Sequence, residues 1–255
     1  MNNAIKLLVN SEAGVGKTEL LRSMGTDTFV ISRDGKKFGL SLPHFLVEEW
    51  VNMSTFLYGG KNTRGEPLEG VTQKIQKYHD AYNAYPTTVA FDSVSQIFMD
   101  VIDLAAQKPN VYGSQGAEVT KEMALLTQFI HESLEMSGIN VILLNHVIPE
   151  KEEGKVTGRY LPFGSGKFLE KKAFFGITNE SITIELSGNQ RRVYTRDADK
   201  LARTTLPELP DVMWIEDFVH PTRSKKLKEG ETYYTLRDHM DLLTNVQSQV
   251  GTFAL

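Results

Sequence analysis

The stretch from Lys6 to Leu21, KLLVNSEAGVGKTELL, limits most strongly what this chain can fold into. A short apolar run, Leu7 to Val9, leads into a turn-rich segment, Ser11 to Gly16, and then into a helical pattern that begins near Lys17. This order of strand, loop and helix is the context that a phosphate-binding P-loop needs. The alternative is a glycine-rich turn that binds nothing. The flanking pattern favours a nucleoside triphosphate site in an α/β fold.

Each residue type in this loop has a chemical reason. Glycines at 14 and 16 let the backbone curl, so that successive N–H groups converge on one anion, and the helix that follows adds the positive end of its dipole. Lys17 is placed to reach the β- and γ-phosphates, and the Thr18 hydroxyl to occupy one position on Mg²⁺. Ser11 replaces the usual first glycine, which is tolerable if that residue needs no positive φ. The predicted nucleotide-binding residues are Ser11, Glu12, Ala13, Gly14, Val15, Gly16, Lys17, Thr18 and Glu19.

Composition sets the outer limits. A chain of 255 residues accommodates one large α/β domain, here residues 1–220, with a short tail and helix at 221–255. The absence of cysteine excludes disulfides and thiolate metal sites and is compatible with a reducing cytoplasm. The N-terminus lacks the pattern of a secretory signal, and no run approaches the roughly 18 apolar residues of a membrane span. A net charge of −4 argues against an overall basic coat for nucleic acid, but a local basic loop remains open.

Polar residues follow the predicted inner strands. Asp34 comes after the strand Thr28 to Ser32, where it is a candidate catalytic base or simply part of an Asp-Gly turn. Asp92 ends the strand Thr87 to Phe91 as a Walker B acid does, holding Mg²⁺ through water, although a helix cap gives the same pattern.

A third inner strand, Ile139 to Leu144, ends in Asn145 and His146. A capped core histidine is one interpretation of His146. Its place at the end of a central strand favours a second one, a polar group that senses the γ-phosphate. The remaining predicted elements are helices at Lys17–Met24, Phe45–Met53, Val71–Tyr82, Val94–Ala106, Thr120–Met136 and Leu236–Val250, a loop at Gln107–Val119 that carries Tyr112, and a hairpin of Thr178–Leu186 with Arg191–Arg196.

The segment Val147 to Lys172 concentrates basic and aromatic residues, and we expect it to be a long flexible loop. Phosphate pairing and base stacking are the uses that such a loop favours. Four acids lie among the bases, so a solvated surface excursion is the alternative. The candidate DNA-binding residues are Tyr112, Lys151, Lys155, Arg159, Tyr160, Lys167, Lys171 and Lys172, with Phe163 as a second aromatic face in the loop.

This order of motifs resembles the RecA-like ATPase core, and more closely the short phage single-strand annealing ATPases of the Sak-four type. The resemblance covers about Ile5 to Asp211 and is strongest at SEAGVGKT, VAFDS and ILLNH. It implies a parallel sheet wound by helices, with a hairpin and a short tail at the C-terminal end. It also implies ATP with Mg²⁺ at the interfaces of a homo-oligomer, either filament or ring, on single-stranded DNA. A single-strand-binding protein is a further implied partner, and the cytoplasm of a bacterial host is the implied location.

Several residues match the family's motifs position by position. Lys17 and Thr18 match the Walker A pair, Asp92 the Walker B acid, and His146 the polar switch residue before the second DNA loop. Gln107–Val119 and Val147–Lys172 correspond to the two DNA loops. Lys200 and Arg203 match basic residues that reach the phosphates of a neighbouring subunit. Asp34 stands where the family has a catalytic glutamate, one methylene longer, so we expect slow, DNA-stimulated ATP hydrolysis.

The sequence thus predicts an ATP-dependent, single-strand DNA-binding protein that promotes annealing or recombination. The lysines and aromatics of Val147–Lys172 favour DNA. A switch ATPase that acts on a protein partner is the alternative, and the acidic net charge favours it. A helicase-type motor is a third reading, for which 255 residues leave little room for a separate collar domain.

Overall fold

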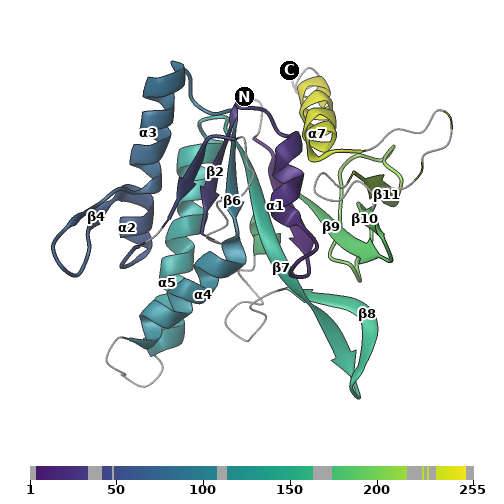
Figure 1. Cartoon of the computed structure of the whole chain (residues 1–255), viewed down its shortest axis with the longest axis horizontal. Coiled ribbons are helices and arrows are strands. Elements are labelled where there is room, and N and C mark those ends of the chain that lie inside the picture. The colour runs from purple at the N-terminus through teal and green to yellow at the C-terminus, as the bar shows by residue number, and fades with distance from the viewer. Residues whose placement is uncertain are drawn as a thin grey trace.

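The computed structural model describes residues 4–33, 42–47, 49–107, 114–162, 174–216, 226, 229 and 234–250. A mixed sheet runs through this part of the chain, with helices on both faces (Figure 1). Its strands are β1 (Lys6–Ser11), β2 (Thr28–Ser32), β3 (His44–Leu46), β6 (Thr88–Asp92), β7 (Asn140–Glu152), β8 (Lys155–Pro162), β9 (Glu180–Ser187), β10 (Gln190–Tyr194) and β11 (Val212–Ile215). A separate two-stranded sheet pairs β4 (Gly60–Lys61) with β5 (Pro67–Leu68).

The order of the main sheet is β11-β10-β9-β1-β7-β6-β2-β3, with β8 paired to β7. From β9 to β3 all neighbours are parallel, whereas β10, β11 and β8 pair antiparallel. The predicted α/β class with a mostly parallel sheet is therefore confirmed. So is the predicted hairpin, which is β9 and β10, and β9 lies directly beside β1.

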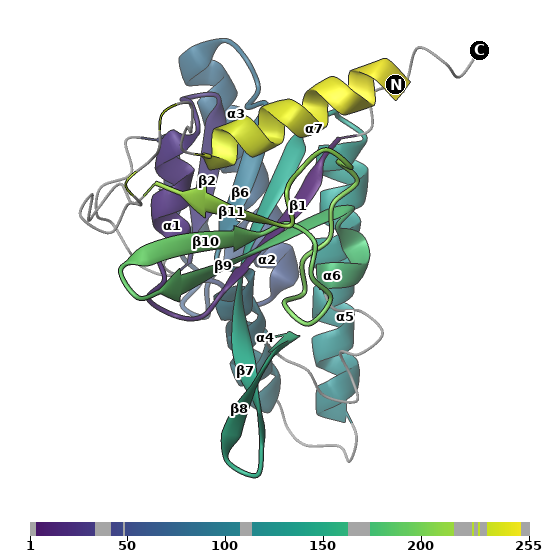
Figure 2. The ribbon, with the colours of Figure 1, turned by 90° about the vertical axis from the view of Figure 1, so that its right-hand side faces the viewer.

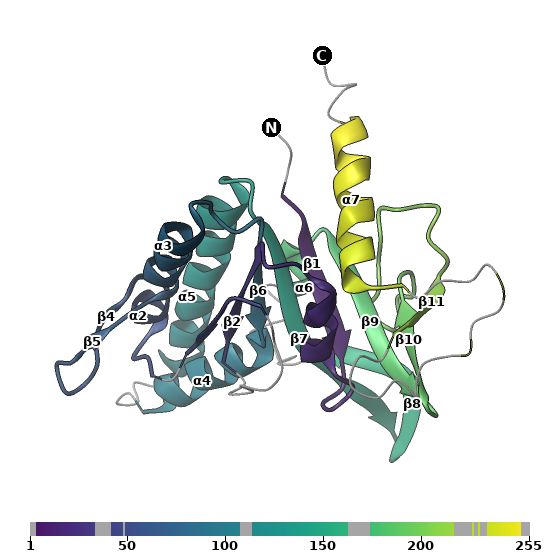
Figure 3. The same ribbon diagram turned by 45° about the horizontal axis from the view of Figure 1, so that its top comes forward.

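The helices are α1 (Lys17–Leu20), the 3-10 turn η1 (Leu21–Ser23), α2 (Met53–Tyr58), α3 (Val71–Tyr82), α4 (Val94–Ala106), α5 (Ser114–Gln128) continued by the π-helical turn η2 (Phe129–Glu135), α6 (Phe174–Ile177) and α7 (Leu236–Val250). Alternation along the strands divides the core, because successive side chains point to opposite faces. Leu8 belongs to the cluster with α2 to α5, whereas Leu7 and Val9 belong to the cluster with α1 and α7. Figure 3 shows these two layers on either side of the sheet.

The predicted bounds of α3, α4 and α7 are confirmed, but two other predicted elements are wrong. The expected helix at Phe45–Met53 is replaced by β3 and by α2, which begins after Asn52 because the Asn52 side chain accepts a hydrogen bond from the Thr55 N–H at 2.9 Å. The loop at Gln107–Val119 gives way to α5 from Ser114 onward. The predicted helix Lys17–Met24 is α1 continued by η1, and this helical stretch ends at Ser23, one residue short of the prediction.

The segment after His146 is not the long loop that the sequence predicts. Strand β7 continues through His146 to Glu152 and folds back as β8, and this hairpin extends beyond the edge of the sheet (Figure 2). Glu152 pairs with Lys155, so the turn consists of Glu153 and Gly154, both with positive φ. That geometry suits the right-handed twist of a two-residue hairpin turn. Residues 163–173 lie outside the described residues.

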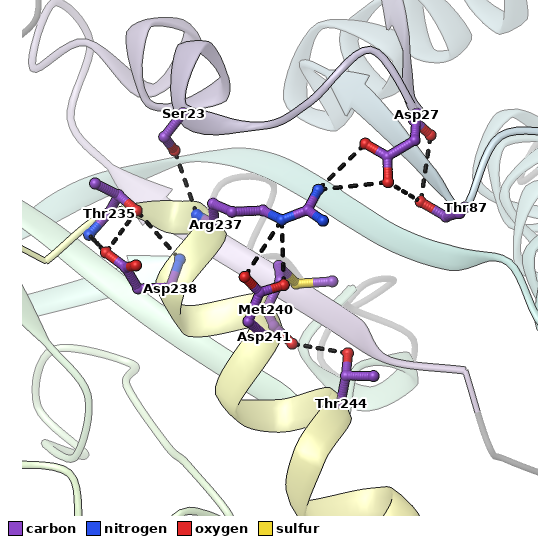
Figure 4. A network of polar contacts seen from close by, with 9 residues as sticks. All are labelled: Ser23, Asp27, Thr87, Thr235, Arg237, Asp238, Met240, Asp241 and Thr244. Carbon is purple, nitrogen blue, oxygen red and sulfur yellow. Dashed lines mark hydrogen bonds and ion pairs between the residues drawn. The ribbon is translucent and has the colours of Figure 1, made fainter.

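Helix α7 belongs to the core. Thr235 and Asp238 cap its first turn, each side chain accepting from the other's backbone N–H, at 3.1 and 2.7 Å (Figure 4). Arg237 then reaches Asp27, before β2, at 3.2 Å, and the Ser23 hydroxyl accepts its backbone N–H (Figure 4). The buried residues Leu236, Met240 and Leu243 pack in the same cluster as α1 and η1. None of the helices described is long and apolar enough to span a bilayer.

Candidate functional site

The loop from Ser11 to Lys17 has the backbone that the sequence predicts. It joins the end of β1 to the start of α1, and Gly14 and Gly16 have φ of +79° and +97°. Such values are readily adopted by glycine and are costly for other residues. Ser11 is the last residue of β1 and is not among the described non-glycine residues with positive φ. Serine is therefore accommodated where the motif usually has its first glycine.

Lys17 is the first residue of α1, and its side chain folds back toward the start of the loop, where it is 6% exposed. Its ammonium donates to the Ser11 carbonyl and hydroxyl oxygens, at 3.1 and 3.0 Å, and to the Glu12 carbonyl at 3.3 Å. Nδ1 of His146 lies 3.0 Å from the same nitrogen. An ammonium has only donors, so Nδ1 must accept and the ring proton belongs on Nε2. Lys17 and His146, predicted separately as phosphate ligand and phosphate sensor, are therefore in direct contact.

Thr18 and Asp92 form the second part of the site. The Thr18 hydroxyl donates to Oδ2 of Asp92 at 2.8 Å, and Asp92 is 1% exposed at the end of β6. A hydroxyl and a carboxylate side by side are the ligands that a P-loop Mg²⁺ uses, with phosphate oxygens and water completing the octahedron. No group of three or more His, Cys, Asp or Glu side chains with metal-binding geometry occurs in the described ranges. Mg²⁺ held partly by a nucleotide needs no such cage, so these two residues fit it.

A network of hydrogen-bonded polar side chains begins at the backbone N–H of His146 and runs into the protein interior. The Ser95 hydroxyl accepts the His146 backbone N–H at 2.6 Å and donates to Asn145 Oδ1 at 2.8 Å. Asn145 donates in turn to Asn10 Oδ1 at 3.0 Å, and Asn10 to the Leu201 carbonyl at 3.3 Å. Buried polar groups bonded in this way fix their neighbours. The network joins α4, β7 and β1 to the turn after β10.

Tyr160 does not offer the free stacking face that the sequence predicts. It is 8% exposed, its hydroxyl donates to Glu12 Oε1 at 3.0 Å, and the Lys200 ammonium lies 4.8 Å from its ring centre. The pKa of the Tyr160 phenol is raised, most strongly by burial and then by its hydrogen bonds to Glu185 and Glu12. The prediction that this ring stacks on bases depends on Val147–Lys172 being a loop. In the hairpin it faces the P-loop instead.

Lys200 and Arg203 lie on the turn after β10 and engage their own chain. Lys200 pairs with Glu185 at 2.5 Å. Burial alone raises the pKa of Glu185, but hydrogen bonds from Lys200, Tyr160 and Tyr194 outweigh it and the net shift is downward. The Arg203 backbone pairs with Ser181, and its guanidinium donates to the Thr178 carbonyl. Action of these two residues on a neighbouring subunit stays a prediction.

The other predicted residues are distributed as follows. Lys151 and Lys155 are exposed on the hairpin, and Arg159 is exposed there but pairs with Asp199 at 3.0 Å. Glu12 contacts Tyr160, and Glu19 forms an ion pair with Arg22. Asp34, Tyr112, Phe163, Lys167, Lys171 and Lys172 lie outside the described residues.

Sequence reasoning missed Arg191, which the fold brings against the loop from Ser11 to Lys17. It lies on β10 and its guanidinium contacts Gly16. No local motif marks it, since an arginine in an alternating strand is ordinarily read as solvent-facing. Arg191 is 3% exposed. This burial depends on the position of β9 beside β1 in the sheet, which local sequence does not indicate.

The sequence matches no protein-family model and no curated protein.

Replacement of Asp92 by asparagine tests the metal assignment. The amide oxygen can still accept from Thr18, so the fold should persist, but the charge that attracts Mg²⁺ is lost. We expect the Mg²⁺ concentration for half-maximal ATP hydrolysis to rise at least about tenfold, with nucleotide affinity in EDTA unchanged. Asp103→Asn, an exposed change on α4, is the matched control. An unaltered Mg²⁺ titration for Asp92→Asn would remove Asp92 from the metal site.

Proposed function

We propose that this protein binds and slowly hydrolyses ATP with Mg²⁺ at the P-loop of a RecA-like core, and that it uses the nucleotide to control binding of single-stranded DNA in annealing or recombination. One observation carries the nucleotide half: Lys17, the Thr18–Asp92 pair and His146 meet at the carboxyl edge of β1, β6 and β7. Ligands of open α/β sheets bind at this edge. Charged, metal-binding and sensing groups in one place are what phosphoryl transfer requires.

The DNA half is supported by the β7–β8 hairpin. His146 contacts Lys17 and lies in the same strand as the hairpin's first arm, so a change at the phosphates has a short physical route to the arm. Lys151, Lys155 and Arg159 are exposed on it and offer phosphate contacts. Nucleotide and DNA would then raise each other's affinity by the same factor.

A protein partner is the second candidate, and the composition of the same hairpin favours it. In residues 147–162 the basic side chains are balanced by Glu150, Glu152 and Glu153. Ile148 and Val156 are 48% and 61% exposed. An arm with balanced charge and exposed apolar side chains suits a protein surface at least as well as a polyphosphate chain.

Binding of a fluorescent oligonucleotide, with and without a non-hydrolysable ATP analogue, separates the two candidates. For DNA we expect binding that is stronger with the analogue and falls with salt. Lys151→Ala and Lys155→Ala should each reduce the slope of log affinity against log salt by roughly 0.7. Ile148→Ser is the matched change on the same arm and should leave that slope unaltered. If the intact protein with analogue binds no oligonucleotide at about 50 mM salt, the DNA half is wrong and the protein-partner candidate replaces it.

A further inference from the structure

Arg191 is a buried cation held rigidly beside the P-loop. It lies on β10 between two strands, paired with Leu186 of β9 and Ile215 of β11. It shares the β10 face of Val193, whose side chain packs in the cluster that contains α1. Arg191 is 3% exposed, so its charge is largely removed from solvent. A charge in such a place is screened much less by salt and water than one at the surface.

The guanidinium of Arg191 lies against the backbone of Gly16. A Cβ added at Gly16 would come within 2.9 Å of Arg191 Cζ and 3.1 Å of Nη1, so the guanidinium fills the space beside this backbone. Gly16 immediately precedes Lys17 and has a φ of +97°. The positive φ requires glycine here, and the Arg191 guanidinium lies in the space that a side chain at this position would enter.

We propose that Arg191 is a second fixed positive charge of the polyphosphate site, and that it positions the Gly16 turn through this contact. The inference rests on the proposed nucleotide binding and deepens it. Because the guanidinium lies against Gly16, one residue before Lys17, its charge is close enough to attract the phosphates of a nucleoside triphosphate in the loop. The charge comes from the same chain, so the site has two cations, Lys17 and Arg191, without a neighbouring subunit. Its effect should increase with the number of phosphates on the ligand.

Two substitutions at Arg191 and one at its neighbour test this. Arg191→Gln removes the charge, and Arg191→Lys keeps it. Arg192→Gln is the matched control, because Arg192 points to the opposite face of β10 and lies 5.1 Å from the ring centre of Trp214. Affinities for ATP, ADP, adenosine and inorganic tripolyphosphate are measured by calorimetry at several salt concentrations, and folding is followed by thermal melting.

For Arg191→Gln we expect ATP and tripolyphosphate affinity to fall at least about tenfold, ADP affinity to fall less, and adenosine affinity to stay the same. The salt dependence of ATP binding should change little, because the buried charge is only weakly screened by salt. Arg191→Lys should retain ATP affinity within about threefold of the parent, and Arg192→Gln should match the parent.

The inference is overturned if Arg191→Gln binds ATP like the parent, or if it loses ATP and adenosine equally, since equal loss indicates a collapsed loop rather than a missing charge. If Arg191→Gln does not fold, Arg191→Lys decides. Retained discrimination between ATP and adenosine supports the charge role, and its loss in a folded protein rejects it. A parent protein that binds neither ATP nor tripolyphosphate would instead reject the proposed nucleotide site itself.

Discussion

Lys17→Ala should lower ATP affinity at least about tenfold and reduce ATP hydrolysis further still. A hydrogen bond from a charged group contributes about 1.5–3 kcal/mol, and Lys17 is placed to make such bonds with two phosphates. In the structure its ammonium bonds Ser11, Glu12 and His146. Nucleotide must displace some of these contacts, so the measured loss is a net value. Calorimetry gives the affinity, and phosphate release gives the turnover.

The control for this change is Lys121→Ala, at an exposed position of α5. Truncation of Lys17 leaves the His146 ring nitrogen and the Ser11 oxygens without the donor they have now, so thermal melting must show that the variant is folded. An ATP affinity equal to that of the parent in a folded Lys17→Ala protein would contradict the P-loop assignment.

Residues of the site that lie at strand ends, or in the loop and helix that follow β1, were predictable. Thr18 and Asp92 are far apart in the chain, but parallel strands bring their carboxyl ends to one edge, and the structure places these two side chains 2.8 Å apart. Lys17 and His146 meet for the same reason. Local patterns therefore sufficed for the part of the site that follows from the direction of the strands.

Residues whose role depends on distant packing were not predictable. The apolar pattern of β7 ends at Ile148, where the strand leaves the core, and the polar residues that follow have a composition typical of a loop. Tyr160 was read as an exposed aromatic and is buried against Glu12. Arg191 matters only through its contact with Gly16, and nothing in its own neighbourhood signals this. The turn Glu153-Gly154 was the one local sign of the hairpin.

The stability of the protein should fall steeply as the pH drops from about 6.5 to about 4, because of a histidine in α7. His239 is fully buried, and neither ring nitrogen has a hydrogen-bond partner among the described residues. The His239 ring packs edge to face against the ring of Tyr234, and the two ring centres are 5.6 Å apart. Burial lowers the pKa of His239 to about 4. The ordinary value near 6.5 returns when the chain unfolds.

The sign follows from the protons bound in each state. Between these two pKa values the unfolded chain binds a proton that the folded chain excludes, so acid favours unfolding in this window. Above about 6.5 both states are neutral and the penalty vanishes. A difference of about 2.5 pKa units corresponds to roughly 3 kcal/mol of unfolding free energy lost by pH 4. The local slope cannot exceed about 1.4 kcal/mol per pH unit from this one group.

Urea unfolding of the parent, His239→Leu and His131→Gln at steps between pH 4 and 8 measures this contribution. Leucine cannot be protonated and leaves no unbonded ring nitrogens in the core, so His239→Leu should be more stable than the parent at low pH and should lose this part of the slope. His131 is exposed, and its replacement should leave most of the slope intact. Because α7 packs against α1 and η1 through Leu236 and Met240, protonation of His239 should loosen the support of the P-loop helix as well. An identical pH profile for His239→Leu and the parent would show that other groups set the acid limit, and that α7 is not where acid unfolding begins.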